Sequence, residues 1–135
     1  MGKRFRDSQR SKLYAWEDAA MPHEGSPLMT IEECQALVNK VWRKYKFATG
    51  ECPTVQAPKR RRGNGCYRPH LNVIILPKWT RMSWYVLHET AHAIGARGEY
   101  HGPNFCRTYA DLLCKFDGWT AVISNMRAFG LKVAR

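Results

Sequence analysis

The sequence predicts an α+β fold in which a small, mostly antiparallel sheet packs on helices. Apolar residues recur at helical spacing in several segments of the chain. One segment, residues 70–77, has the β-branched composition of a strand and lies between two prolines. With 135 residues, the chain is long enough to form one domain with its own core. We therefore expect a single domain over residues 1–135.

The N-terminal part predicts a basic arm followed by two helices. Residues 1–8 are basic and lack an apolar core behind them, so they predict a flexible arm and not a secretory signal. Residues 8–20 predict a helix that ends at the next proline. Thr30 and Glu33 have the spacing of a capping box, and an apolar stripe follows them. This pattern predicts an amphipathic helix over residues 31–46.

The middle of the chain, from residue 48 to residue 69, loses helical periodicity because glycines and prolines interrupt it. Short strands are expected around residues 54–56 and 66–68. The basic stretch over residues 58–65 predicts a hairpin tip or a mobile loop. Its four consecutive basic side chains are candidate contacts for nucleic acid: Lys59, Arg60, Arg61 and Arg62.

Three more helices are expected after the strand at residues 70–77. The first runs from about residue 80 to residue 96, and a glycine shortly afterwards ends it. The second covers residues 103–116 and has a proline in its first turn. The third covers residues 119–129 and also ends at a glycine. Two helices, then a few short strands, then three helices along the sequence are the pattern of an α+β fold.

The helix expected over residues 80–96 contains the sequence HETAH, from His88 to His92. Side chains four residues apart share one face of a helix, so both imidazoles project together and can bind one ion. Glu89 lies beside them, near enough to reach a water on that ion without ligating it. The spacing therefore predicts a zinc site with Glu89 as the general base.

A catalytic zinc ion usually has three protein ligands and one open position, so a third ligand is needed. The metzincin pattern HExxHxxGxxH would place a histidine at position 98, where this chain has Gly98. The next histidine is His101, and Glu99 is the alternative. We favour His101 because imidazole is a good zinc ligand and the following helix would hold it rigidly.

The stretch "HETAHAIG", followed by "HGPNF", resembles the SprT-like zinc metallopeptidases, in which HExxH precedes an HG pair and an aromatic residue. The matching residues are His88, Glu89, His92, His101, Gly102 and Phe105. The chain is also similar to small HExxH proteins of phages and bacteria, which share a segment like "RDSQRSKLYAWE". The separate zinc ribbon that SprT-like domains often carry is not found in this sequence.

The resemblance implies a zincin-like fold with the HExxH motif on a central helix. It also implies one Zn²⁺ ion, bound by His88, His92 and His101, that activates a water to hydrolyse a peptide bond. Glu89 would take the proton of that water and pass it to the leaving amine. Candidates for stabilising the transition state are Tyr100, Tyr85, His70 and Arg97. An extended peptide could pair with the strand at residues 70–77 if that strand lies at the sheet edge.

The net charge of +11 favours polyanionic partners. The alternative function is therefore a basic nucleic-acid-binding protein in which the zinc site is structural or vestigial. The expected partners are a protein or peptide substrate and non-specific nucleic acid. The longest apolar run is far too short to cross a bilayer, so we expect no membrane partner and an intracellular, cytoplasmic location. The sequence leaves the oligomeric state and the substrate open.

Overall fold

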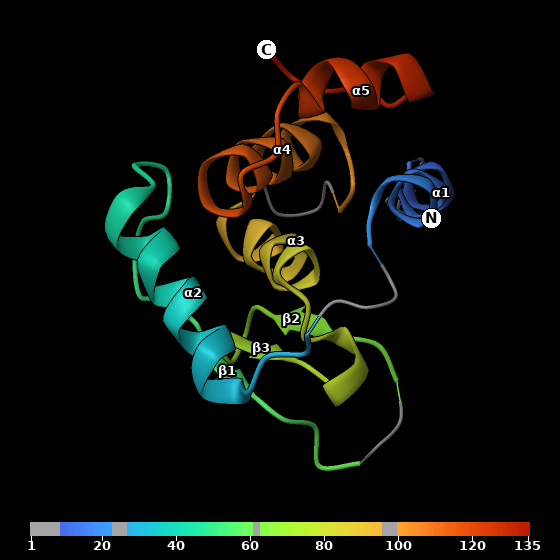
Figure 1. Ribbon diagram of the computed structural model, residues 1–135. Coiled ribbons are helices and arrows are strands. Elements are labelled where there is room, and N and C mark those ends of the chain that lie inside the picture. Colours follow the sequence, from blue (N-terminus) through green and yellow to red (C-terminus); the bar gives the residue numbers. More distant parts are fainter. Residues whose placement is uncertain (1–8, 23–26, 61–62, 96–99) are drawn as a thin grey trace, which may run out of the picture. The chain divides into compact units, whose positions relative to one another are not determined.

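The structure, a computed structural model, is built from helices and one small sheet (Figure 1). It describes residues 9–22, 27–60, 63–95 and 100–135. In chain order the elements are α1 (Arg10–Ala20), α2 (Ile31–Lys44), β1 (Thr54–Gln56), β2 (Cys66–Arg68), β3 (Val73–Ile75), the 3-10 helix η1 (Lys78–Thr80), α3 (Ser83–Ile94), α4 (Pro103–Asp117) and α5 (Val122–Phe129). These elements confirm the α+β class. The arm expected over residues 1–8 lies outside the described part.

The chain divides into two units. The sheet unit comprises residues 24–94 and contains α2, α3 and the three strands. The helical unit comprises residues 1–23 and 95–135, so it joins α1 to α4 and α5 from the other end of the chain. The assignment of residues 1–135 to one domain stays a prediction.

The sheet is mixed, with the strand order β1-β3-β2. β1 runs parallel to β3, with Thr54 opposite Val73, and β2 runs antiparallel to β3, with Cys66 opposite Ile75. The expectation of a mostly antiparallel sheet is therefore wrong for one of the two strand pairs. β1 and β2 lie at opposite edges of this sheet, so the basic loop between them is not a hairpin tip. The hairpin is formed by β2 and β3 instead.

β3 is the central strand, and this corrects the idea that it is a free edge for a peptide. Both of its sides are hydrogen-bonded to neighbouring strands, and its middle residue, Ile74, is fully buried. The strand is also shorter than the expected residues 70–77, because residues 69–72 form the turn from β2. Asn72 has a positive φ of 52° in that turn. A substrate strand would have to use another edge.

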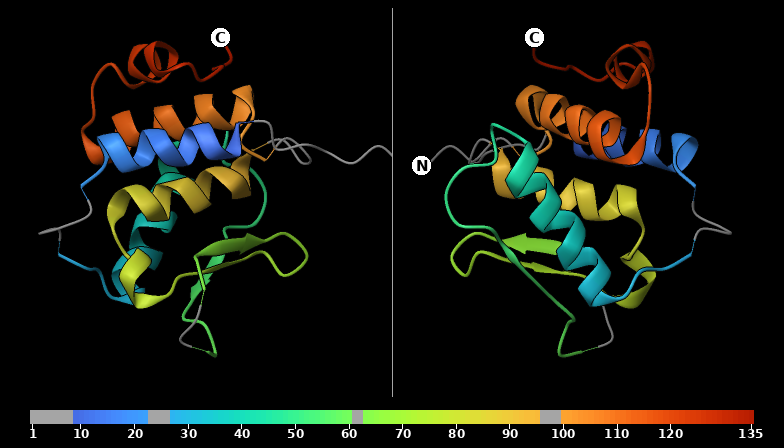
Figure 2. Two further views of the ribbon diagram at one scale, coloured as in Figure 1. Left: turned by 90° about the vertical axis from the view of Figure 1, so that its right-hand side faces the viewer. Right: turned by 60° about the vertical axis from the view of Figure 1, so that its left-hand side comes forward.

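α2 and α3 cover one face of the sheet (Figure 2). α2 contacts β1, α3 contacts β2, and the two helices contact each other. The buried side chains of this core are Cys34, Val38, Val55, Ile74, Leu76 and Val86. On the other face of the sheet, Thr54, Gln56 and Arg68 are exposed. The core of the sheet unit therefore lies between the sheet and its two helices.

α2 begins at the predicted capping box, and one of its side chains, Gln35, hydrogen-bonds to the backbone at the β1 edge of the sheet. The Glu33 N–H donates to Thr30 Oγ1, and the Thr30 N–H donates to Glu33 Oε1, each over 3.1 Å. One turn later, Gln35 Oε1 accepts a hydrogen bond from the Val55 N–H over 2.6 Å, and Gln35 Nε2 donates to the Pro53 carbonyl over 3.0 Å. A side chain of α2 thus occupies backbone groups at the β1 edge. The other edge of the sheet belongs to β2.

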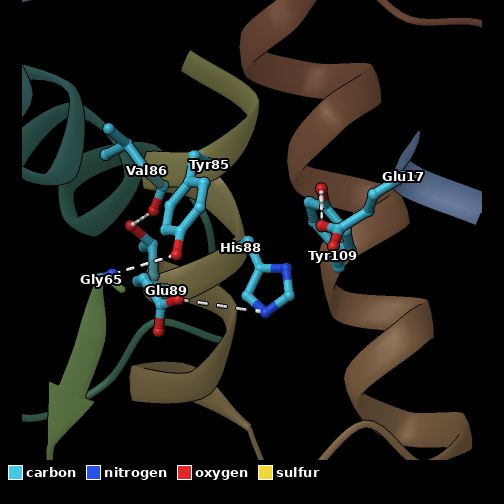
Figure 3. Close-up of polar contacts among 8 residues, drawn as sticks. Glu17, Gly65, Tyr85, Val86, His88, Glu89 and Tyr109 are labelled. Atoms are coloured by element: carbon cyan, nitrogen blue, oxygen red, sulfur yellow. Dashed lines mark hydrogen bonds and ion pairs between the residues drawn. The ribbon is translucent and has the colours of Figure 1, made fainter. Parts of the chain in front are cut away.

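In the helical unit, α1 lies along α4 (Figure 2). The rings of Trp16 and Tyr109 meet edge to face, with centroids 6.2 Å apart. The Tyr109 hydroxyl donates to the buried carboxylate of Glu17 over 2.8 Å (Figure 3). α5 packs against α4, and Trp16 Nε1 donates to Asn125 Oδ1 of α5 over 2.7 Å. α1 is therefore fixed to both C-terminal helices by buried aromatic rings and polar contacts.

Candidate metal centre

α3 carries the HETAH sequence within a largely buried helix. It begins at Ser83, later than expected, because the residues just before it form the 3-10 turn η1, where the Thr80 hydroxyl donates to the Pro77 carbonyl over 2.7 Å. Seven of its 12 residues are buried. The buried Thr90 hydroxyl donates to the Val86 carbonyl of the same helix over 2.7 Å. The Thr90 hydroxyl therefore has its hydrogen-bond partner within α3, and Thr90 can be buried in an apolar environment.

His88 and His92 lie on one face of α3, as their spacing predicts. Their ring centroids are 5.1 Å apart. His88 is buried and His92 is half-buried. Glu89 is also buried, and its Oε2 lies 4.0 Å from His88 Nε2 (Figure 3). A buried carboxylate therefore lies directly beside His88.

Tyr85 packs against the first histidine of the motif. Its ring stacks on that of His88, with centroids 6.1 Å apart and an angle of 28° between the planes. The Gly65 N–H donates to the Tyr85 hydroxyl over 3.0 Å (Figure 3). A Cβ at Gly65 would lie 2.6 Å from Cε1 of Tyr85, so this approach requires a glycine. The backbone just before β2 therefore fixes the phenol beside His88.

His101, just before α4 in the helical unit, is buried among aromatic rings of its own unit. Its ring meets Tyr14 edge to face at 5.4 Å and Phe105 at 5.0 Å. Its carbonyl accepts a hydrogen bond from Gln9 Nε2 over 2.9 Å and a weaker one from Cys106 Sγ over 3.6 Å. Both the backbone and the ring of this histidine are therefore held in place.

The part played by Gln9 and Tyr14 was not predicted from the sequence. Gln9 is buried, and besides bonding to His101 it donates to the Lys132 carbonyl over 3.1 Å and accepts from the Lys132 N–H over 2.6 Å. Nothing in the local pattern connects Gln9 with a histidine 92 positions away. The available signal was that both residues belong to the "RDSQRSKLYAWE" segment. The structure gives that segment a physical role around His101.

Three histidines, His88, His92 and His101, each offer a ligand nitrogen, and these atoms all lie within 4.8 Å of one another. They are therefore close enough to bind one metal ion. Among the described residues, the group contains no carboxylate or thiol. Glu99, the alternative third ligand, lies outside the described residues, and so does Arg97.

The other candidate residues lie in exposed positions or outside the described part. Tyr100 directly precedes His101, has a positive φ of 55° and is 52% exposed. His70 is exposed in the turn that follows β2, at the opposite end of that strand from Gly65. In the basic loop Lys59 and Arg60 are exposed, whereas Arg61 and Arg62 fall outside the described residues. Tyr85 is the candidate that the structure describes in contact with a motif residue.

Cys34 is a buried thiol whose raised pKa keeps it from acting as a nucleophile or a metal ligand. Burial raises the pKa of its thiol from 9.0 to about 11, and the nearby Arg81 guanidinium offsets this in part. Burial also raises the pKa of the Cys52 thiol. Because the thiolate is the nucleophilic and metal-binding form, Cys34 is a structural residue of the core.

No family model matches the chain, and no curated protein or solved structure matches it either. Within the residues that the structure describes, no helix combines the length and the apolar character needed to span a bilayer. The residues of the candidate centre are therefore the available guide to function.

Proposed function

We propose that this protein is a zinc-dependent metallopeptidase that hydrolyses peptide bonds with Glu89 as the general base. The observation that carries the proposal is the grouping of His88, His92 and His101 within 4.8 Å, with a buried carboxylate 4.0 Å from the first of them. The likeness of the motif to the SprT-like peptidases points to the same activity. A zincin-like fold around α3 belongs to this proposal.

The donor set suits zinc better than the common hard cations. Mg²⁺ and Ca²⁺ prefer oxygen ligands, whereas neutral imidazole nitrogens suit Zn²⁺. Zn–N bonds of about 2.0–2.1 Å at tetrahedral angles place the ligand nitrogens about 3.3 Å apart. The ligand atoms of the three histidines lie within 4.8 Å of one another, which is close enough for them to share one ion. Three protein ligands also leave a fourth position for water, as in catalytic zinc centres.

In this proposal, Glu89 and its surroundings perform the proton transfers. Bound zinc would acidify a water and polarise the scissile carbonyl. Glu89 then accepts the water proton and delivers it to the leaving nitrogen. Its carboxylate is buried and lies 4.0 Å from His88, so it is within reach of a water on the proposed ion. Tyr85, whose ring packs on His88, is the candidate donor to the developing oxyanion.

An extended peptide would reach this site along β2. β3 is paired on both sides, and Gln35 occupies backbone groups at the edge formed by β1. β2 is the remaining edge strand, and it contacts α3. Pairing with this edge would align a peptide next to the HETAH helix.

The test measures metal content and cleavage on the same samples. Protein purified without added metal should contain about one zinc ion per chain, and it should cleave members of an unbiased peptide pool, read by mass spectrometry. Glu89→Gln should keep zinc but lose about 10²–10⁴-fold in cleavage rate. Glu32→Gln makes the same chemical change at an exposed position of α2 and should leave the rate unchanged. A protein that takes up no zinc, or a Glu89→Gln variant that still cleaves, would contradict the proposal.

The net charge of +11 supports a second candidate, a nucleic-acid-binding protein whose zinc site is structural or vestigial. Exposed basic side chains occur at the end of α2 (Lys40, Arg43 and Lys44) and in the loop after β1 (Lys59 and Arg60). In this case Glu89→Gln would bind DNA or RNA as the unaltered protein does. Neutralising residues 59–62 would weaken that binding and make it less dependent on salt.

A further inference from the structure

We infer that Trp79 forms a subsite beside α3 that selects substrates with an aromatic or large aliphatic side chain near the scissile bond. This inference rests on the proposed peptidase function and adds a substrate class to it. It depends on residues of the sheet unit alone. Three features support it: the exposure of Trp79, the contacts that fix it, and its position at the edge of the sheet.

Trp79 is exposed, whereas two other tryptophans of this chain are fully buried and two are half-buried. Its side chain lies on the 3-10 turn η1, and the residue is 52% exposed. Trp16 and Trp84 are 2% and 4% exposed, and they serve the core. An indole that is left half in water contributes little to the core, whereas its large apolar face is well suited to binding a ligand.

Despite its exposure, Trp79 is held rigidly. Its Nε1 donates to the Gly63 carbonyl over 3.3 Å, and its ring meets that of Tyr85 edge to face at 5.8 Å. The turn beneath it is closed by the Thr80 N–H, which donates to the Pro77 carbonyl over 2.9 Å. A side chain fixed in this way loses little conformational freedom when a ligand covers it.

Trp79 is connected to the proposed metal ligand His88 through one intervening side chain, Tyr85. Tyr85, which touches Trp79 on one side, stacks on His88 on the other at 6.1 Å. The partners of the two aromatic side chains, Gly63 and Gly65, belong to the segment that enters β2. The aromatic surface therefore lies at the start of the edge strand and beside the HETAH helix. A peptide paired with β2 would carry a side chain past this surface, because alternate side chains of a strand stand on the same face.

The test compares cleavage and binding in matched variants. Peptides that differ in one position, Phe against Ala, are offered to the zinc-loaded protein, and kcat and KM are measured for each. The unaltered protein should prefer Phe by about 10-fold in kcat/KM, and Trp79→Ala should lose that preference through KM while kcat is kept. Phe47→Ala removes a similarly exposed aromatic ring, 58% exposed against 52% for Trp79, from the loop after α2 and should keep the preference.

A second measurement does not need cleavage. The same peptides are titrated into the Glu89→Gln protein by calorimetry, with and without Trp79→Ala, after circular dichroism has shown equal helix content. The Phe peptide should bind about 10-fold more tightly than the Ala peptide where Trp79 is present, and equally where it is absent. Equal binding of both peptides to Glu89→Gln, or an unchanged preference in Trp79→Ala, overturns the subsite.

The two proposals fail in different ways. If Phe peptides bind through Trp79 but no zinc-dependent cleavage is found, the peptidase function is wrong and the subsite stands as a peptide-binding surface. If cleavage depends on zinc and on Glu89 but ignores Trp79, the peptidase function stands and the subsite is wrong.

Discussion

Removing the side chain of Gln9 should weaken both the fold and the candidate metal centre. This side chain makes four buried or partly buried hydrogen bonds: to the His101 carbonyl, to the Lys132 carbonyl, from the Lys132 N–H and, weakly over 3.6 Å, to Cys106 Sγ. A neutral hydrogen bond contributes about 0.5–1.5 kcal/mol net, and a buried partner left unsatisfied costs about 1–3 kcal/mol. The His101 carbonyl keeps a weak donor in Cys106. We therefore expect Gln9→Ala to lower the free energy of unfolding by about 2–4 kcal/mol.

The assay is urea unfolding of the metal-free protein, followed by circular dichroism, with Ser11→Ala as the control. Ser11 is exposed on the first turn of the same helix, and its replacement should change the free energy of unfolding by less than about 0.5 kcal/mol. Gln9→Glu is a sharper variant. It retains an oxygen to accept from the Lys132 N–H but places a second oxygen against the His101 carbonyl, so it should also destabilise the protein.

Zinc affinity provides a readout that separates positioning from general stability. Gln9 holds the backbone of His101, and losing a group that orients a metal ligand typically costs about 10–100-fold in affinity. Gln9→Ala should therefore bind zinc more weakly than the unaltered protein, under conditions in which both are folded. If Gln9→Ala unfolds at the same urea concentration as Ser11→Ala and binds zinc equally well, the role given to Gln9 is refuted.

Three further predictions concern Gly65 and Cys34 of the sheet unit. Gly65→Ala should displace the Tyr85 ring, because the added Cβ would lie 2.6 Å from it; we expect a loss of about 1–3 kcal/mol in urea unfolding, and an unchanged midpoint would contradict the close packing. At pH 8 a thiol reagent should label the exposed Cys114 of the folded protein and leave the buried Cys34 unlabelled until urea is added; equal labelling rates would show that Cys34 is accessible. Because folding raises the pKa of Cys34 from 9.0 to about 11, the folded state binds more protons than the unfolded state between these values. The stability that this thiol contributes is complete below pH 9 and decreases as the pH rises to 11, and Cys34→Ala should reduce that decrease in a series of urea titrations.

Local patterns in the sequence predicted most of the secondary structure. The capping box at Thr30 and Glu33 correctly placed the start of α2, and glycine and proline signals placed the limits of α4 to within one residue. These elements were predictable because caps and helical periodicity involve residues within one or two turns of each other. The start of α3 was misplaced, since a 3-10 turn precedes it.

Strand pairing was the feature that the sequence predicted least well. The β-branched run around Ile74 correctly indicated a buried strand, but a central strand and an edge strand with buried side chains have the same composition. The parallel pairing of β1 with β3 depends on how the chain returns across the sheet. No local sequence pattern predicts the parallel direction of this pairing, because the paired residues are far apart in sequence.

The sequence by itself determined the α+β class and the pairing of His88 with His92, together with Glu89 beside them, because a helix of known period places residues four apart on one face. It also nominated His101 by its chemistry. Tertiary structure decided which groups surround these residues: Gln9, Tyr14 and Phe105 around His101, and Tyr85 and Gly65 beside His88. Most of these contacts join segments that are distant along the chain, and the packing that brings such segments together depends on the whole fold, not on the pattern within any one element.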